Sequence, residues 1–517
     1  MTRPSITPAE PAVPEPPASA AGAGGTPSPS LSERLSEWAS TLRYRDLPDR
    51  VVDLAKSQIL SQLAAIRAGA SHELGRLLVA AFGDPVGSDP GRAACVFAGL
   101  GSWLNLDDTA YAGHLSNSTV GVGLAYADAL GLDGRGLLTA VVAANECAAR
   151  VTAAATLGPF RGQTAAHTSL VGAVAARLHC AEVPATTWTD AIGLAMVAPQ
   201  WTLLHAFLGG DGRLLSSLAP VRAAMDACDA AEAGLRGVAD ALEHPDGFLA
   251  RFAAVPLPEV VAAHLGRRWH TDTLSFKVRP GGPGIDSAVD CALEIRRQAG
   301  DLRPADVADI LVETSAYTVY VGRQLDRHGA GPATPAAVLP LSVPYAVATA
   351  LLVGDLVVAD FAAPAKHDLR RWQLAGKVRV VEDAGMTFDL VSSDAPFGDA
   401  LRQAGRRAEG WLTHFVGAEA ADMLDKLGEP AASFEHARKY TGARVTVRAA
   451  DGRSFSARRD IPIGAAGPDT RARHRELVQA KFAATGGPDV VARTCADLEH
   501  ADPGQVAAMI RATLRLP

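Results

Sequence analysis

"GRGLLTAVVAANECAARVTAAA", residues 134–155, is the stretch that decides the fold. Leu, Val and Ala fill most of it, and its charged residues are Arg135, Glu146 and Arg150. The apolar residues recur at the three- and four-residue spacing that is typical of an α-helix. A helix that is apolar nearly all round is buried inside a bundle rather than exposed on its surface. The stretch therefore predicts the centre of a large, all-helical domain.

Segments of the same kind lie on both sides of it along the chain. They predict further buried helices over residues 116–130, 164–180, 186–198 and 216–229. Together these segments predict a helical domain over residues 31–271. A tail, residues 1–30, precedes it and is rich in Pro, Ala, Gly and Ser, so we expect this tail to be disordered.

The sequence pattern changes near residue 272. Three segments are rich in β-branched residues and predict strands, namely ADILVETSAYTVYV (308–321), GKVRVVEDAGMTFDLV (376–391) and GARVTVRAADGRSFSARRDI (442–461). Helical patterns over residues 284–299 and 335–353 alternate with these segments. The alternation predicts a mixed α+β domain that is smaller than the helical one.

We therefore predict a mainly α protein, with a large all-helical domain and a smaller α+β lid domain. The lid domain is expected over residues 272–463, with a helical insertion at 395–437. Helical patterns over residues 464–517 predict C-terminal helices that return to the helical domain.

The composition argues against several classes of protein. The 517 residues carry a net charge of −7 and no long basic run, which argues against a nucleic-acid-binding surface. The apolar runs stop short of the roughly 20 residues of a membrane span, and the N-terminus lacks a signal-peptide pattern. We therefore expect a cytoplasmic protein that binds neither nucleic acid nor membranes. The nearly all-apolar helices also favour a homodimer.

The sequence predicts neither a metal ion nor an organic cofactor. Its six cysteines are isolated and form no CxxC pair, so they indicate reduced core residues rather than a zinc site. The glycines of FLGGDGR fit neither a P-loop nor a dinucleotide-binding turn.

The stretch WLNLDDTAYAGHLSNSTVG, residues 103–121, places two acids and a histidine after an apolar helix. His114 is the best candidate for proton transfer, because imidazole titrates near neutral pH, and Asp107 or Asp108 can orient it. Adjacent side chains on an extended chain point to opposite sides, so we expect one of the two acids to face a site. The alternative is a loop histidine bonded to backbone beside acids that cap a turn.

Cations form the second group of candidates. Lys277 precedes VRPGG, whose glycines allow a ligand to approach the backbone closely. Lys277, Arg279 and Arg161 are candidates to bind one carboxylate or an enolate oxygen; the alternative is that they are solvated surface residues. His167 and His205 lie on apolar helical patterns, where a histidine is more often a satisfied core residue.

Three longer motifs resemble those of one enzyme family. They are ATPAAVLPLSVPYAVATALLVGDL (333–356), LNLDDTAYAGHLSNSTVGVGLAYADALG (104–131) and KVRPGGPGIDSAVD (277–290). They resemble the family segments A-x-F-S-x-P-Y-x-x-A-x-A-L-x-x-G, D-F-D-D-T with H-P-S-x-x-V, and K-x-Y-P-x-C-x-x-x-H-x-x-x-D. The set resembles the MmgE/PrpD family, which contains 2-methylcitrate dehydratase, cis-aconitate decarboxylase and iminodisuccinate epimerase.

The resemblance implies a dimer, a metal-independent reaction, and an active-site cleft between the helical domain and the lid. It matches His114 and Lys277 to a histidine and a lysine of the family motifs. Other family positions are altered: Asn105 replaces an aspartate, Arg161 a histidine, Gly212 (beside Arg213) a lysine, Arg279 a tyrosine, Gly282 a cysteine and Asp286 a histidine. Tyr320 in TVYVGRQ aligns with a site tyrosine.

We therefore predict catalytic roles for His114, Asp107, Asp108 and Lys277. The predicted substrate contacts are Asn105, Thr109, Arg161, Arg279, Asp286 and Tyr320. The expected activity is that of a lyase, a dehydratase first, which removes a proton next to a carbonyl or carboxylate of a small or mid-sized molecule. Because the cations that bind a polyacid are only partly present, methylcitrate itself is not the expected substrate. An isomerase or cyclase of secondary metabolism, and a catalytically silent binding homologue, are the alternatives.

Overall fold

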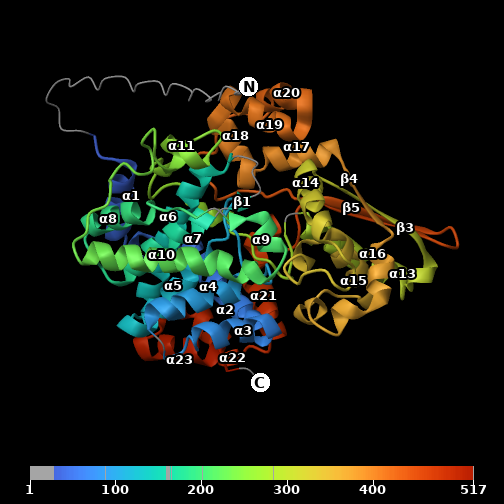
Figure 1. Cartoon of the computed structure of the whole chain (residues 1–517), viewed down its shortest axis with the longest axis horizontal. Coiled ribbons are helices and arrows are strands. Elements are labelled where there is room, and N and C mark those ends of the chain that lie inside the picture. The colour runs from blue at the N-terminus through green and yellow to red at the C-terminus, as the bar shows by residue number, and fades with distance from the viewer. Residues whose placement is uncertain are drawn as a thin grey trace, which may run out of the picture.

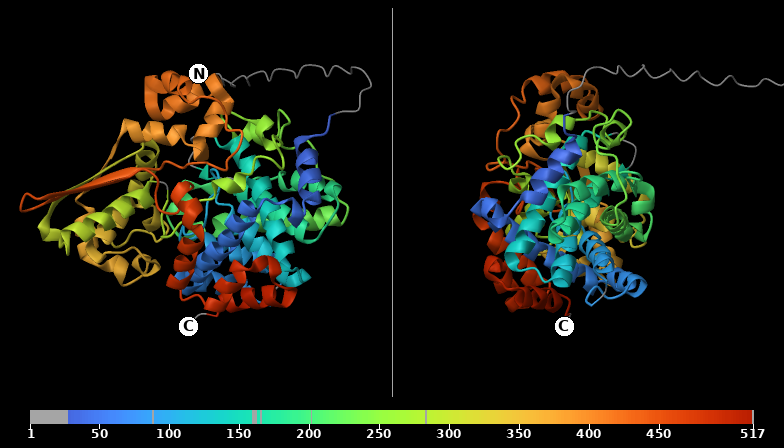
Figure 2. Two further views of the ribbon diagram at one scale, coloured as in Figure 1. Left: turned by 180° about the vertical axis from the view of Figure 1, so that it is seen from behind. Right: turned by 90° about the vertical axis from the view of Figure 1, so that its left-hand side faces the viewer.

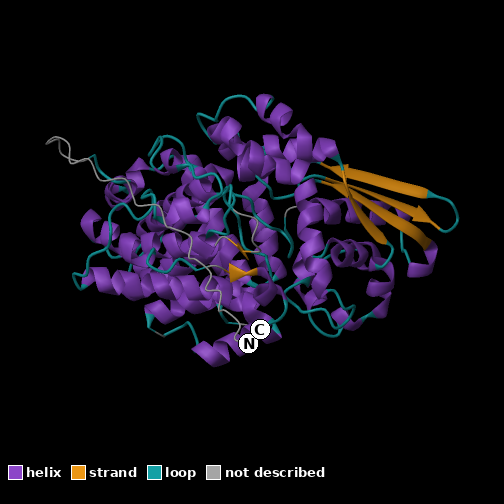
Figure 3. Ribbon diagram, turned by 45° about the horizontal axis from the view of Figure 1, so that its top comes forward, coloured by secondary structure: helices purple, strands orange, loops and turns teal. Residues whose placement is uncertain are grey.

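The computed structural model describes residues 28–87, 89–158, 163–164, 166–200, 202–282 and 284–515. The chain is mainly helical, with a four-stranded sheet at one end (Figure 3), which confirms the predicted fold class. The helical half, coloured blue to green, lies to one side of the sheet and its helices (Figure 1). Most of the predicted tail lies outside the described residues. Ser30 already belongs to the folded chain, because its hydroxyl accepts a hydrogen bond from the Glu33 backbone and caps α1 (Leu31–Thr41).

Helix α6 (Gly134–Ala155) is the centre of the helical half. Every residue from Leu137 to Ala155 is buried, as its apolar sequence predicts. This helix is long and apolar enough to cross a membrane, but its apolar window is fully buried inside the protein. It packs on α7 (Ala166–Cys180) and α5 (Ser116–Leu130). A Cβ on Gly172 of α7 would lie 2.4 Å from the Ser118 hydroxyl of α5, so these helices approach closely because the residue is glycine.

Other helices surround this centre. They are α2 (Asp49–Ser71), α3 (Glu73–Phe82), α4 (Pro90–Ser102), α8 (Ala185–Ala195), α9 (Leu204–Leu208), α10 (Leu215–Glu232), α11 (Phe248–Phe252) and α12 (Pro258–Val261). A two-stranded ribbon of β1 (Gln163–Thr164) and β2 (Thr202–Leu203) lies among them.

The sheet has four strands in the order β4-β3-β5-β6. Strand β3 (Val307–Thr314) pairs in parallel with β4 (Val378–Glu382) and antiparallel with β5 (Ala443–Ala449), and β5 forms a hairpin with β6 (Ser454–Arg459). The helices α13 (Ile285–Ala299), α15 (Val343–Val353) and α16 (Leu369–Ala375) lie along it. Figure 2 shows the hairpin extending away from the helical half.

Two of the predicted strand segments are strand in their first half only. Over 308–321 the strand ends at Thr314, and Ser315 caps helix α14 (Ala316–Leu325) by accepting a hydrogen bond from the Thr318 backbone. Over 376–391, Asp383 caps helix α17 (Ala384–Ser392) in the same way. A serine or aspartate that satisfies free amide groups favours a helix start over a longer strand. The predicted helix 335–353 likewise begins later, at Val343, after the cap Ser342.

The predicted insertion, residues 395–437, consists of short helices as far as Asp425, whereas residues 426–437 are not helical. It contains α18 (Asp399–Ala404), α19 (Glu409–Val416) and α20 (Ala420–Asp425), which stand above the junction of the two halves (Figures 1 and 2). At the other end of the molecule, α21 (Pro468–Ala484), α22 (Asp489–Ala496) and α23 (Pro503–Thr513) pack against the helical half. An ion pair between Lys56 and Glu499 (2.9 Å) ties them to α2.

Candidate active site

A cavity of about 450 Å³ is lined by residues from both halves of the molecule. Six of the predicted site residues line it: Asn105, Thr109, His114, Lys277, Asp286 and Tyr320. Asp107 is fully buried beside His114. Asp108 and Arg279 are absent from the lining, and Arg161 lies outside the described residues.

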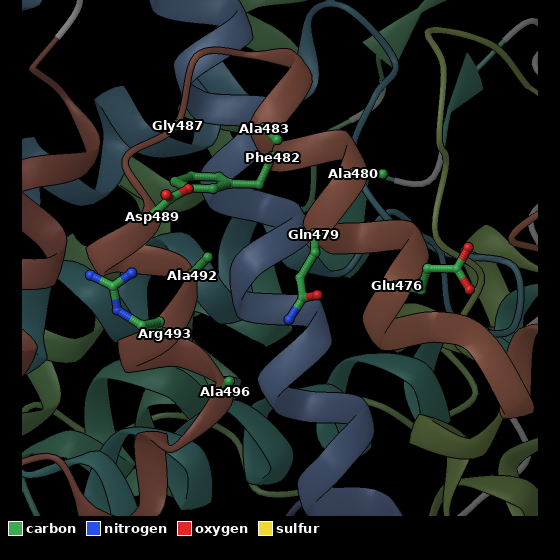
Figure 4. A pocket seen from close by; sticks show the side chains of 10 residues that line it. All are labelled: Glu476, Gln479, Ala480, Phe482, Ala483, Gly487, Asp489, Ala492, Arg493 and Ala496. Atoms are coloured by element: carbon green, nitrogen blue, oxygen red, sulfur yellow. The ribbon is translucent and has the colours of Figure 1, made fainter.

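A second hollow of about 460 Å³ lies between α21 and α22 (Figure 4). It is lined by side chains such as Gln479, Phe482 and Arg493, which include none of the predicted site residues. The cavity between the two halves is therefore the candidate site.

The loop that carries His114 is held by a bent backbone and by a short bridge to a distant segment. Asn105 and Tyr111 adopt positive φ angles of 54° and 51°, which turn the chain twice after α4. Between these turns Thr109 exchanges both backbone hydrogen bonds with Ser275, at 3.1 and 2.8 Å. Because Lys277 follows Ser275 by two residues, this bridge brings the lysine to the acids of the loop.

Asp107 and His114 form a carboxylate–imidazole pair. Nδ1 of His114 lies 2.7 Å from Oδ2 of Asp107, and Asn117 donates a second hydrogen bond to the same oxygen at 2.8 Å. A buried carboxylate on Nδ1 keeps the proton there and leaves Nε2 as the basic nitrogen. The His114 side chain is 49% exposed although the loop is buried, because it faces the cavity. Burial lowers the pKa of His114 despite the opposing charge of Asp107, so the ring is a neutral base.

Lys277 lies on the other side of Asp107, with Nζ 3.6 Å from Oδ1. Burial would raise the pKa of Asp107, but the hydrogen bond from His114 and the charge of Lys277 outweigh it and hold this pKa well below its usual range. Burial also lowers the pKa of Lys277, against the attraction of Asp107. Within the described part of the chain the Lys277 ammonium is buried without a hydrogen-bond partner. It is therefore suited to receive an oxygen of a bound molecule.

Asp108 binds different partners from Asp107. Its Oδ1 accepts a hydrogen bond from Ser61 of α2 at 2.6 Å and lies 3.7 Å from Nζ of Lys481 in α21. Burial raises its pKa to about 6. This acid therefore joins helices behind the loop. Arg279 also turns from the cavity and pairs with Asp290 (3.2 Å) and Asp355 (3.6 Å).

Two further buried cations line the cavity. Lys439 donates a hydrogen bond to the Thr109 hydroxyl at 3.0 Å, and burial lowers its pKa to about 8. Arg213 donates to the Ala337 carbonyl at 3.2 Å, and burial lowers its pKa to about 10. In the sequence Arg213 stands beside the altered lysine position, whereas Lys439 lies in the local basic run HARKY, which gave no sign of a site.

Asp286 is an acidic group of the cavity lining. It lies in the first turn of α13, and burial raises its pKa to about 7 in spite of the nearby Lys277 charge. Gly281 makes room for it, because a Cβ there would lie 2.4 Å from its Oδ1. Asn105 holds the same turn by donating a hydrogen bond to the Gly281 carbonyl.

His167 is buried, as its interpretation as a core residue predicted, but it also lines the cavity. It lies in the first turn of α7, where burial lowers its pKa to about 4, and Nε2 has no partner among the described residues. Its ring packs on Phe248 with the ring centroids 5.0 Å apart. His205 is not a core residue: it is exposed, and its ring lies 5.3 Å from that of His328.

Both halves of the chain match models of one family. The MmgE/PrpD N-terminal domain matches residues 33–259, and the MmgE/PrpD C-terminal domain matches residues 282–422. The chain belongs to the MmgE/PrpD family. No curated protein matches the chain. Membership of MmgE/PrpD supports a lyase-type activity.

The cavity of this MmgE/PrpD protein draws on both matched domains and on segments beyond them. His114 and Arg213 lie in the first, Asp286 and Tyr320 in the second, and Lys439 lies after both.

Among the described residues, a group with metal-ligating spacing is found at the surface, formed by Asp497, Glu499 and His500. It lies outside the cavity lining.

Proposed function

We propose that this protein is a lyase, specifically a dehydratase, that acts on a 3-hydroxy carboxylate or carbonyl compound. The hydrogen-bonded pair of His114 and buried Asp107, facing the cavity beside Lys277, is the observation that carries the proposal. Nε2 of His114 takes the proton from the carbon next to the carboxylate or carbonyl group.

The electron pair of the broken C–H bond moves onto the carboxylate or carbonyl oxygen. Lys277 and Lys439 are the buried cations that stabilise this oxygen, and they do so without reorganising at the moment of reaction. Asp107 remains ionised and stabilises the imidazolium that forms on His114.

Asp286 supplies the proton for the leaving hydroxyl group. With a pKa raised to about 7, it is partly protonated at neutral pH and works as a general acid. The C–O bond breaks, hydroxide takes the proton from Asp286 and leaves as water, and a C=C bond forms. Proton exchange with solvent then restores His114 and Asp286.

Deuterium exchange tests the first step directly. In D2O, the enzyme should introduce deuterium next to the carboxylate of a 3-hydroxy acid, measured by NMR with 3-hydroxybutyrate and 3-hydroxy-3-phenylpropionate. His114→Ala should lower this rate at least about a hundredfold, because a positioned base contributes roughly 10²–10⁴-fold. His205→Ala, which changes an exposed histidine outside the cavity lining, is the matched control. Equal rates for wild type and His114→Ala, with unchanged circular dichroism, would disprove the role of His114.

An isomerase or cyclase remains the second candidate. His167 supports it, because a second neutral imidazole in the wall can return a proton at another position. Product analysis separates the candidates: a dehydratase releases water and forms an alkene, whereas an isomerase returns a product of unchanged mass.

A further inference from the structure

Five aromatic residues form a continuous wall of the cavity, which we call the aromatic wall. They are Tyr317, Tyr320, Phe397, Trp411 and Phe415, and all five line the cavity. The two tyrosines belong to α14 of the lid, and the other three belong to the helical insertion that stands above it (Figure 1).

The rings of the aromatic wall pack on one another. Phe415 is at the centre, with ring centroids 5.1 Å from Trp411, 5.9 Å from Tyr320 and 6.2 Å from Tyr317. Phe397 lies 5.4 Å from Trp411 and 5.3 Å from Tyr317. Tilted and edge-to-face rings at this spacing stabilise one another, so the wall is a formed apolar surface.

Trp411 also joins the insertion to the helical half. Its indole N–H donates a hydrogen bond to the Gly158 carbonyl at 3.1 Å. The polar atom of this ring is therefore satisfied inside the protein, and a molecule in the cavity meets the apolar ring.

The net positive charge of the cavity lining is small, so it can balance few negative charges on a ligand. Lys277, Lys439 and Arg213 supply three positive charges, Asp107 removes one, and Asp286 titrates near neutral pH. One or two ligand carboxylates balance the remainder. A third carboxylate would have to lie against aromatic rings, where an unpaired charge is costly.

We propose that the substrate is amphipathic: an acid or carbonyl head at His114 and Lys277, and a hydrocarbon or aromatic arm against the aromatic wall. The position of the head rests on the proposed function, whereas the arm rests on the lining of the cavity. Small polyacids fill the charged part and make no contact with the aromatic wall, so they bind more weakly than an acid with an apolar arm.

Binding of simple acids tests the inference without turnover. By isothermal titration, the dissociation constant should fall from acetate through butyrate and hexanoate to octanoate, roughly threefold to fourfold for each buried methylene. 3-Phenylpropionate should bind more tightly than citrate. An affinity that does not change with chain length, or tighter binding of citrate, would overturn the inference.

Two wall variants and one control locate the arm. Trp411→Ala should weaken octanoate binding at least about tenfold and leave acetate binding unchanged. Phe415→Ser changes a partly exposed wall residue and should have the same effect if Trp411→Ala does not fold. Phe455→Ser, at a half-buried phenylalanine on β6 outside the cavity lining, should change neither affinity. Chain-length dependence that survives in a folded wall variant would also overturn the inference.

The same measurements separate this inference from the proposed function. If octanoate binds tightly but deuterium exchange is absent or insensitive to His114→Ala, the proposed chemistry fails and the arm site stands. If exchange depends on His114 while acids of all lengths bind equally, the chemistry stands and the arm site fails.

Discussion

Asp107 and Asp108 are adjacent, yet they are bound to different parts of the molecule. Asp107 holds the imidazole of His114 at the cavity, and Asp108 holds Ser61 and Lys481 between two helices. The bend of the chain at Asp107 accompanies this division, since the two side chains bind partners from different elements. We therefore expect the charge of Asp107 to serve catalysis and the charge of Asp108 to serve stability, and substitution of each acid separates the two roles.

Asp107→Asn should lower turnover at least tenfold, because the charge that stabilises the His114 imidazolium is lost, and it should also lower the melting temperature, because the buried Lys277 loses its carboxylate. Asp108→Ala should lower the free energy of unfolding by about 3 kcal/mol, because it leaves the buried Lys481 without its carboxylate. Steady-state kinetics and urea denaturation measure the two effects. The division would be refuted if Asp108→Ala, while folded, lost as much turnover as Asp107→Asn.

The pH dependence of turnover should be bell-shaped. On the acid side, the rate rises as His114 loses its proton, at a pKa that burial lowers below the usual 6.5. On the basic side, the rate falls near pH 7, where Asp286 loses the proton that it donates. Asp286→Asn removes this acid, so it should lower the rate and abolish the fall near pH 7. A rate that rises steadily from pH 5 to 9 in the wild type contradicts the acid role of Asp286.

At the scale of elements, helix caps decide where a strand ends and a helix begins, which the periodicity of apolar residues leaves open. The β-rich segments 308–321 and 376–391 each contain a cap, Ser315 or Asp383, at which the strand gives way to a helix. The turn after β3 is the reason why Tyr317 and Tyr320 come to the cavity on a helix. The start of α13 also depends on one residue. Its N-cap is Gly284, and a Cβ there would lie 2.1 Å from the Thr318 hydroxyl of α14.

Two glycines at helix ends allow a matched experiment, Gly284 at the start of α13 and Gly131 at the end of α5. Both have left-handed backbone, with φ angles of +80° and +68°, so alanine at either costs roughly 1–2 kcal/mol of backbone strain. A Cβ at Gly284 would lie 2.1 Å from the Thr318 hydroxyl, whereas a Cβ at Gly131 meets open space. Gly284→Ala should therefore lower the melting temperature more than Gly131→Ala and also reduce turnover, because it displaces α14 from the start of α13. Equal melting temperatures and rates would show that backbone strain alone matters at Gly284.

At the scale of the molecule, the fold class followed from the sequence more readily than the cavity did. The apolar run of α6 has few possible environments, so its burial was predictable. The sequence predicted an acid beside His114 within one loop, and left open whether it is Asp107 or Asp108; the structure has Asp107. Lys439 and the rings of α19 reach the cavity through tertiary packing of distant segments, which no local spacing encodes.

The predicted homodimer also belongs to this scale, and the surface of the helical half offers a place for it. Val197, Leu235 and Val238 are 81%, 60% and 63% exposed, and Val238 lies against Gly193 in α8, shortly before Val197. Apolar side chains that are grouped and exposed mark contact surfaces. We expect light scattering to give a dimer at micromolar concentration, and Val238→Asp to shift it towards monomer. Leu369→Asp, at a residue of the lid that is 61% exposed, is the control and should remain dimeric. A wild-type monomer would disprove the dimer, and a dimer unaffected by Val238→Asp would place the interface elsewhere.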